Sequence, residues 1–144
     1  MRQALGLAEA AAKRDEVPVG AVIVDKNGKV IAAASNRVEE WCDPSAHAEV
    51  VAIREACRAL GTTKLVECDM YVSLEPCTMC AQAISFARIR RLYYGASDPK
   101  MGGIEQGSKV FMSSTCHHKP EVYGGIMAAP SEALMKAFFQ AKRS

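Results

Sequence analysis

The chain has 144 residues, of which 49% are hydrophobic and 24% charged, a balance that predicts one globular domain over residues 1–144 and excludes disordered, collagen-like and fibrous classes. The net charge of +2 favours neither a nucleic-acid binder nor a membrane-surface protein. The longest apolar runs are far shorter than the roughly 20 residues of a membrane helix, and no secretory leader pattern opens the chain. We therefore expect a cytoplasmic protein with no membrane partner.

The first part of the chain predicts a helix followed by a hairpin. Residues 2–14 are rich in Ala, Leu, Glu and Lys with an apolar stripe, which indicates an amphipathic helix. Residues 17–24 form a nearly unbroken apolar strand, and its lack of alternation implies burial on both faces of a sheet. The Asn27-Gly28 pair predicts a turn, after which residues 29–34 run back antiparallel.

A second helix and a crossover unit follow. The second helix ends at Gly61, and its predicted buried stripe is Ala46, Val50, Ile53, Cys57 and Leu60. Residues 69–74 then predict a strand, residues 77–86 a helix and residues 89–94 another strand. Strand, helix and strand in this order predict two parallel strands with helices covering the sheet, and therefore an α/β fold.

The last part of the chain has fewer regular elements. Residues 97–125 are loop-rich, and strand character is weak over residues 121–126. A final helix over about residues 131–142 has a predicted apolar face that consists of Leu134, Ala137, Phe138 and Ala141.

Two cysteines have the spacing of metal ligands. Cys77 and Cys80 lie three residues apart at the expected first turn of a helix, so both sulfurs can meet one ion. Alone, this spacing also fits a redox pair or chance. His47, at the start of the preceding helix, adds an imidazole, and three protein ligands leave zinc a fourth position for water, as in catalytic sites. The set predicts an enzyme with one zinc ion.

Glu49 lies two residues after His47, too close to act as a relaxed fourth ligand but able to reach a zinc-bound water. A carboxylate in this place can move protons, so we predict that Glu49 is the catalytic residue. The order His-x-Glu followed by Pro-Cys-x-x-Cys is the signature of zinc nucleobase deaminases.

The remaining cysteines and histidines fit ordinary structural roles. Cys57 and Cys68 are expected in or beside the core, and Cys42 and Cys116 in loops without a thiol partner at ligand spacing. His117 and His118 admit a second-metal interpretation, but adjacent loop histidines are more often solvated, as we expect here.

Short motifs accompany the deaminase signature over nearly the whole chain. They are residues 16–22, 36–37, 46–49, 74–80, 94–96, 98–100 and 138–143. With them the chain resembles the bacterial tRNA adenosine deaminases of the cytidine deaminase superfamily. The resemblance implies a three-layer α/β/α fold with a mixed central sheet of about five strands flanked by helices, and a homodimer with one zinc per subunit. The implied reaction is hydrolytic deamination of adenosine to inosine at the wobble position of a tRNA anticodon.

The resemblance also implies substrate contacts. Asn36 matches the position that hydrogen-bonds the target nucleoside, and Asp98 matches the position that contacts the ribose beside it. By themselves both residues also fit turn-forming roles. The implied base pocket adds Val17, Pro18 and Ala48, of which the first two also lie in the predicted strand.

Basic charge gathers late in the chain. Residues 1–86 hold 9 Lys and Arg and 12 Asp and Glu, whereas residues 87–144 hold 9 and 4. This excess can supply a phosphate-binding rim beside the zinc, and an exposed aromatic ring can stack on an extruded base. The candidates for the anticodon stem-loop are Arg88, Lys100, Lys109, Phe139, Lys142 and Arg143.

Two other functions compete with this hypothesis. A zinc deaminase of a free base or nucleoside, such as guanine or cytosine, would use the same ligands and the same Glu49. A non-catalytic zinc module that binds RNA or a protein partner would need the ligands but not the carboxylate.

Overall fold

The computed structural model describes residues 1–143, and in this part of the chain a five-stranded mixed sheet is flanked by α-helices. The strands lie in the order β2-β1-β3-β4-β5 and are β1 Gly20–Val24, β2 Val30–Ser35, β3 Asp69–Leu74, β4 Arg91–Ala96 and β5 Glu121–Tyr123. The helices are α1 Arg2–Lys13, α2 Ala48–Leu60, α3 Thr78–Phe86, α4 Ala128–Arg143 and a short 3-10 helix, η1 Val110–Met112. None of these helices is long and apolar enough to cross a membrane.

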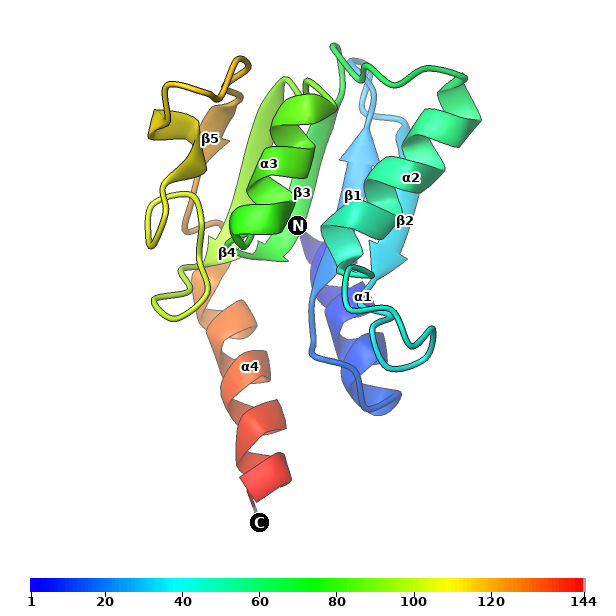
Figure 1. Ribbon diagram of the computed structural model, residues 1–144. Coiled ribbons are helices and arrows are strands. Elements are labelled where there is room, and N and C mark those ends of the chain that lie inside the picture. The colour runs from blue at the N-terminus through cyan, green and yellow to red at the C-terminus, as the bar shows by residue number, and fades with distance from the viewer. Residues whose placement is uncertain (144) are drawn as a thin grey trace.

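The helices form two layers on the sheet. Figure 1 shows α2 and α3 side by side in front of the sheet and α1 behind it. Helix α4 contacts α1, β3 and β4, and its Ser131 hydroxyl donates a hydrogen bond to the Ser73 carbonyl. The predicted three-layer α/β/α fold with a mixed sheet is therefore confirmed.

The hairpin forms as predicted, but its first strand is shorter. Strand β1 pairs antiparallel with β2, and the Asp25 carboxylate accepts N–H bonds from Asn27 and Lys29 in the turn, each at 2.9 Å. The expectation that the strand begins at Val17 is wrong, because β1 begins at Gly20. Pro18 has no N–H to donate to the sheet, and the Val19 N–H bonds the Val17 carbonyl at 2.8 Å. Val17 and Pro18 are thus freed from the sheet.

The crossover unit is confirmed with a shift in its second strand. Strands β3 and β4 pair in parallel through α3, with Tyr71 opposite Tyr93. Strand β4 begins at Arg91 rather than Ile89, because the Ile89 N–H still bonds the Ile84 carbonyl of α3 at 3.3 Å. Residue Arg88, with φ of 59°, makes the turn between the two elements.

The buried side of α2 differs from the predicted stripe. Its fully buried residues are mainly alanines four positions apart, which let the helix lie close to β1 and β2. They are Ala48, Ala52 and Ala56. Val50, Ile53 and Cys57 are half-buried, and Leu60 is exposed. A spacing of three and four residues is present both in the predicted stripe and in the neighbouring stripe of alanines. In the structure the alanine stripe faces the sheet.

Helix α4 is longer and more exposed than predicted. It begins at Ala128, and Ser131 is its buried residue. On the predicted apolar face, Leu134 and Phe138 are half-buried, whereas Ala137 and Ala141 are exposed. The helix extends beyond the sheet, as Figure 1 shows in red, so its second half has no sheet to cover.

Candidate metal centre and active site

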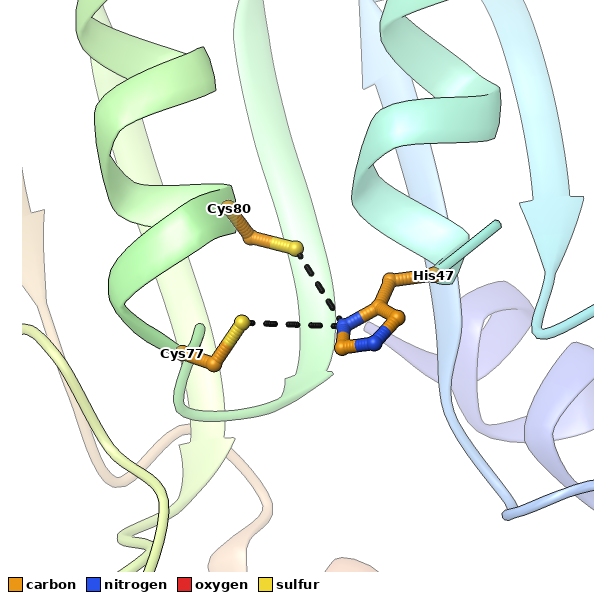
Figure 2. Close-up of side chains that lie close together, drawn as sticks. All are labelled: His47, Cys77 and Cys80. Atoms are coloured by element: carbon orange, nitrogen blue, oxygen red, sulfur yellow. Dashed lines mark hydrogen bonds between the residues drawn. The ribbon is translucent and has the colours of Figure 1, made fainter. Parts of the chain in front are cut away.

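Two helices begin at the same end of the sheet and bring three potential metal ligands together. His47 is the N-cap of α2 and Cys77 is the N-cap of α3, both in extended conformation. Cys80 lies one turn further along α3, on the same face as Cys77. Figure 2 shows the three side chains pointing toward one another from the ends of the two helices. The fold thus unites residues that are 30 or more positions apart.

The spacing of the three side chains fits one zinc ion. The His47 Nδ1 atom lies 3.6 Å from the sulfur of Cys77 and 3.6 Å from that of Cys80, and all three ligand atoms lie within 4.8 Å of one another. In tetrahedral zinc, ligands at about 2.0 Å (nitrogen) and 2.3 Å (sulfur) lie about 3.6 Å apart. One imidazole and two thiolates are also donors that zinc accepts. The residues present therefore fit the ion in both distance and chemistry.

The pKa values of the two thiols are shifted in opposite directions. Hydrogen bonds from Cys80 and from His47 lower the pKa of Cys77 to about 4. The pKa of Cys80 is raised, chiefly by its hydrogen bond with Cys77 and by burial. The positive end of α3 also favours a thiolate at its N-cap. One thiolate therefore forms readily, and a metal ion can displace the proton held by the other.

Glu49 is the second residue of α2 and is buried, with 4% of its surface exposed. Burial raises the pKa of Glu49 to about 7. Cys80 lies near enough to influence this pKa, but the Glu49 carboxyl is outside the three-ligand group. The structure thus places a carboxyl beside the ligands rather than among them.

A cavity of about 1640 Å³ opens at the metal ligands and extends to the end of α4. Ten of the predicted site residues line it, namely His47, Glu49, Cys77, Asn36, Val17, Asp98, Lys100, Phe139, Lys142 and Arg143. Five others do not, namely Cys80, Pro18, Ala48, Arg88 and Lys109.

Asn36 follows β2 and presents a polar group to this cavity. It is 6% exposed, its N–H donates to the Val19 carbonyl at 3.1 Å, and its carbonyl accepts from Arg14. Its side chain is one of those that line the cavity. Val17 lines the cavity nearby, whereas Pro18 and Ala48 are fully buried behind its wall.

Asp98 combines a place on the cavity with a turn-forming role. One of its carboxylate oxygens accepts N–H bonds from Lys100 at 3.2 Å and Met101 at 3.1 Å. The backbone N–H of Asp98 is in turn bound by Glu75.

Two buried carboxylates near the site were not predicted as functional. Glu75 is 2% exposed and accepts backbone N–H bonds from the loop of Asp98, and Glu16 is 1% exposed and accepts them from Glu39 and Glu40. Each acid directly adjoins an apolar segment in the sequence, where an unpaired charge is costly, and this is the signal that can reveal such residues.

The basic candidates divide into two groups. Lys100, Lys142 and Arg143 line the cavity, but Lys142 pairs with Asp15 and lies 5.6 Å from the centre of the Phe138 ring. Phe139 is 41% exposed. Arg88 follows the end of α3 opposite to Cys77, and Lys109 precedes η1, so neither lies on the cavity.

The other histidines and cysteines form no second ligand group in the described part of the chain. His117 is exposed as predicted. The expectation that His118 is solvated is wrong, because the ring is half-buried and its Nε2 lies 2.7 Å from the Ile89 carbonyl. Cys116 lies in a loop without a thiol partner, as predicted, but it is buried, with its sulfur 3.3 Å from the Ser85 hydroxyl.

Comparison with known proteins agrees with this site. Residues 1–96 match the cytidine and deoxycytidylate deaminase zinc-binding region. The chain is 55% identical to a tRNA-specific adenosine deaminase of Agrobacterium fabrum, over 99% of this chain and 93% of that protein. A solved structure from work on A-to-I editing by tRNA:A34 deaminases is 56% identical, covers 93% of this chain and 96% of its own, and has a TM-score of 0.91. A guanine deaminase from Bacillus subtilis is 33% identical with a TM-score of 0.65, covering 99% of this chain and 90% of its own.

Proposed function

Because this chain belongs to the zinc-binding cytidine and deoxycytidylate deaminases and, among them, to the tRNA-specific adenosine deaminases, we propose that it converts adenosine to inosine at the wobble position of a tRNA anticodon. One arrangement carries the proposal. A three-ligand cluster with a buried carboxyl beside it adjoins a cavity that extends to basic side chains of the last helix. The whole of residues 1–144 acts as one deaminase domain.

His47, Cys77 and Cys80 would hold one zinc ion per subunit. Three is the number of protein ligands found at catalytic zinc sites. When bound, zinc supplies Lewis-acid activation and lowers the pKa of a water molecule toward about 7. The three residues also fix the start of α2 and α3 at the cavity, so the ion is held where a base can reach it.

Glu49 moves the protons of the reaction. Its carboxylate accepts a proton from the attacking water, whose oxygen forms a bond to C6 of the adenine. Glu49 delivers this proton to ring nitrogen N1, then takes the proton of the hydroxyl now on C6 and passes it to the 6-amino group, so that the C6–N6 bond breaks and ammonia leaves. The products are inosine and ammonia. Because Glu49 is buried beside the ligand cluster, few bulk water molecules compete for this role.

The target nucleoside lies against Asn36, whose side-chain amide can donate and accept hydrogen bonds with the base or sugar. Val17 supplies an apolar wall to the base pocket, with Pro18 and Ala48 supporting it from behind. Asp98 contacts the neighbouring ribose from the opposite loop.

The outer part of the cavity holds the anticodon stem-loop. Lys100, Lys142 and Arg143 contact phosphates, and Phe139 stacks on a loop base. Arg88 and Lys109 can contribute only at a distance from the cavity. An unpaired loop base is extruded at lower cost than the few kcal/mol needed in a duplex, so a loop suits this enzyme better than a duplex does.

The enzyme acts as a homodimer in the cytoplasm, where tRNA is found. Apolar side chains are exposed on the layer formed by α2, α3 and η1, and patches of this kind are uncommon on monomers. They are Leu60 at 46%, Met79 at 39%, Phe86 at 75% and Met112 at 78% exposure. A second copy of the chain would cover these residues.

The test offers the purified protein four substrates, namely an anticodon stem-loop with a wobble adenosine, free adenosine, guanine and cytosine. We expect inosine in the stem-loop with an equal amount of ammonia, and little ammonia from the three small molecules. Ammonia from guanine or cytosine without inosine in the RNA would replace the proposal with a free-base deaminase. Zinc and RNA binding without any ammonia would indicate a non-catalytic module, and a lack of zinc would reopen the redox interpretation of the two thiols.

A further inference from the structure

Glu75 directly precedes Pro76 and lies two residues before the metal ligand Cys77, and its carboxylate accepts an unusual set of hydrogen bonds. Its carboxylate is 2% exposed and has no cationic partner among its hydrogen bonds. One oxygen accepts the N–H of Asp98 at 2.9 Å. The other accepts three successive N–H groups, those of Ile104 at 3.1 Å and of Glu105 and Gln106 at 3.0 Å each. Successive N–H groups that converge in this way form a concave site for an anion.

The loop that Glu75 binds is also fastened to the metal-ligand turn. The N–H of Gly103 donates to the Pro76 carbonyl at 2.8 Å, and Gly102 pairs with Cys77. A β-carbon at Gly102 would lie 2.6 Å from the second oxygen of Glu75, and one at Gly103 would lie 2.6 Å from the Thr78 nitrogen. The loop can therefore approach the carboxylate and the start of α3 only with glycine at these two positions.

This loop carries two of the predicted site residues that line the cavity. Asp98 and Lys100 lie at its beginning, between the end of β4 and Gly102. The Glu75 side chain holds the loop at both ends, at Asp98 and at residues 104–106. The same residue is joined through Pro76 to the ligand turn, so one carboxylate links the position of the loop to that of the metal site.

We infer that Glu75 is a positioning residue that holds the loop of Asp98 and Lys100 in its RNA-binding place over the active site, through four backbone hydrogen bonds. Both of its carboxylate oxygens are occupied by N–H groups of the loop, so it acts through the loop. Its loss should therefore weaken binding of the stem-loop and leave the chemical step largely intact. The choice of RNA as the ligand rests on the proposed function, whereas the ordering of the loop does not.

The decisive variant is Glu75→Gln, because glutamine keeps the shape but has one acceptor oxygen where the loop needs two. The matched control is Asp69→Asn. Asp69 is a buried carboxylate at the other end of β3, bound to Arg90 at 2.9 Å through both oxygens. Both changes remove a buried negative charge next to or within the same strand, but only Glu75→Gln disturbs the loop.

Hydrogen exchange of the zinc-loaded protein tests the ordering of the loop without RNA. We expect amides of residues 98–106 to exchange at least tenfold faster in Glu75→Gln and at the wild-type rate in Asp69→Asn. Unchanged exchange in Glu75→Gln would overturn the inference, whether or not the protein proves to be a tRNA deaminase. A wild-type enzyme that makes no inosine would refute the proposed function, while this measurement still decides the role of Glu75.

Steady-state kinetics on the stem-loop tests the consequence. For Glu75→Gln we expect KM to rise at least fivefold with kcat within threefold of wild type and zinc content unchanged, and for Asp69→Asn neither constant to change. In the double variant Asp98→Ala/Lys100→Ala, the loop has already lost the side chains that contact the RNA. Adding Glu75→Gln to this double variant should therefore raise KM less than twofold further. A fall in kcat with KM unchanged, or full additivity, would contradict the inference. If Glu75→Gln does not fold, Gly102→Ala displaces the loop from the other side and should give the same rise in KM.

Discussion

Replacing Glu49 with glutamine should abolish most of the deaminase activity while leaving the metal site intact. The three ligand atoms that lie within 4.8 Å of one another belong to His47, Cys77 and Cys80, and Glu49 is outside that group. Glutamine has nearly the same shape as glutamate and can stay in the buried position at the start of α2. It cannot, however, accept and return a proton. We therefore expect one zinc per subunit in the variant, as in the wild type.

The size of the loss follows from the groups that surround Glu49. The other carboxylates that line the cavity are either exposed, as are Asp15, Glu39 and Glu40, or occupied by backbone N–H groups, four at Glu75, two at Asp98 and two at Glu16. None of them is free to replace the missing proton carrier. The full contribution of a general acid–base residue, about 10²- to 10⁴-fold in rate, should be lost. This corresponds to about 3 to 5 kcal/mol in the activation barrier.

Single-turnover conversion of an anticodon stem-loop, with zinc measured by mass spectrometry on the same samples, provides the assay. The control is Glu55→Gln, the same chemical change on an exposed part of α2, which should keep full activity. Glu49→Gln with more than a tenth of the wild-type rate would refute the role of Glu49 in proton transfer. Loss of zinc in Glu49→Gln would show instead that the carboxyl helps to hold the ion.

Three further variants test other parts of the account. Cys80→Ala should lose both zinc and turnover, as should wild-type protein after dialysis against a strong chelator, and stoichiometric zinc in Cys80→Ala would exclude that residue as a ligand. Phe86→Lys should weaken self-association by at least about a hundredfold in sedimentation experiments, because two large exposed rings per dimer lose their apolar contact, and an unchanged dimer would place the interface elsewhere. Asp15→Asn should free Lys142 from its ion pair, tighten stem-loop binding about two- to fivefold and steepen its salt dependence. Unchanged or weaker binding would show that Lys142 does not contact phosphate.

The pairing of Cys77 with Cys80 and the crossover unit could be predicted because their signals are local. Cys77 and Cys80 share a helix face by their spacing alone, and a strand on each side of that helix dictates a parallel pair. The antiparallel hairpin at Asn27-Gly28 depends likewise on the turn that these two residues favour. In each case a few neighbouring residues determine the geometry.

Features that depend on distant contacts could not be read from the sequence. The buried side of α2 depends on how closely its alanines let it approach the sheet, whereas the start of β1 depends on the local bond between Val19 and Val17. The role of Glu75 depends on loop residues 23 to 31 positions away.

Sequencing of tRNA after incubation with the pure zinc-loaded protein tests the central claim most directly. Inosine reads as guanosine, so conversion can be located at single-nucleotide resolution along every tRNA in the sample. The account predicts inosine at the wobble position of tRNAs that carry adenosine there, and at no other position. Unmodified wobble adenosine after incubation with active, zinc-loaded enzyme, or inosine scattered over other adenosines, would contradict it.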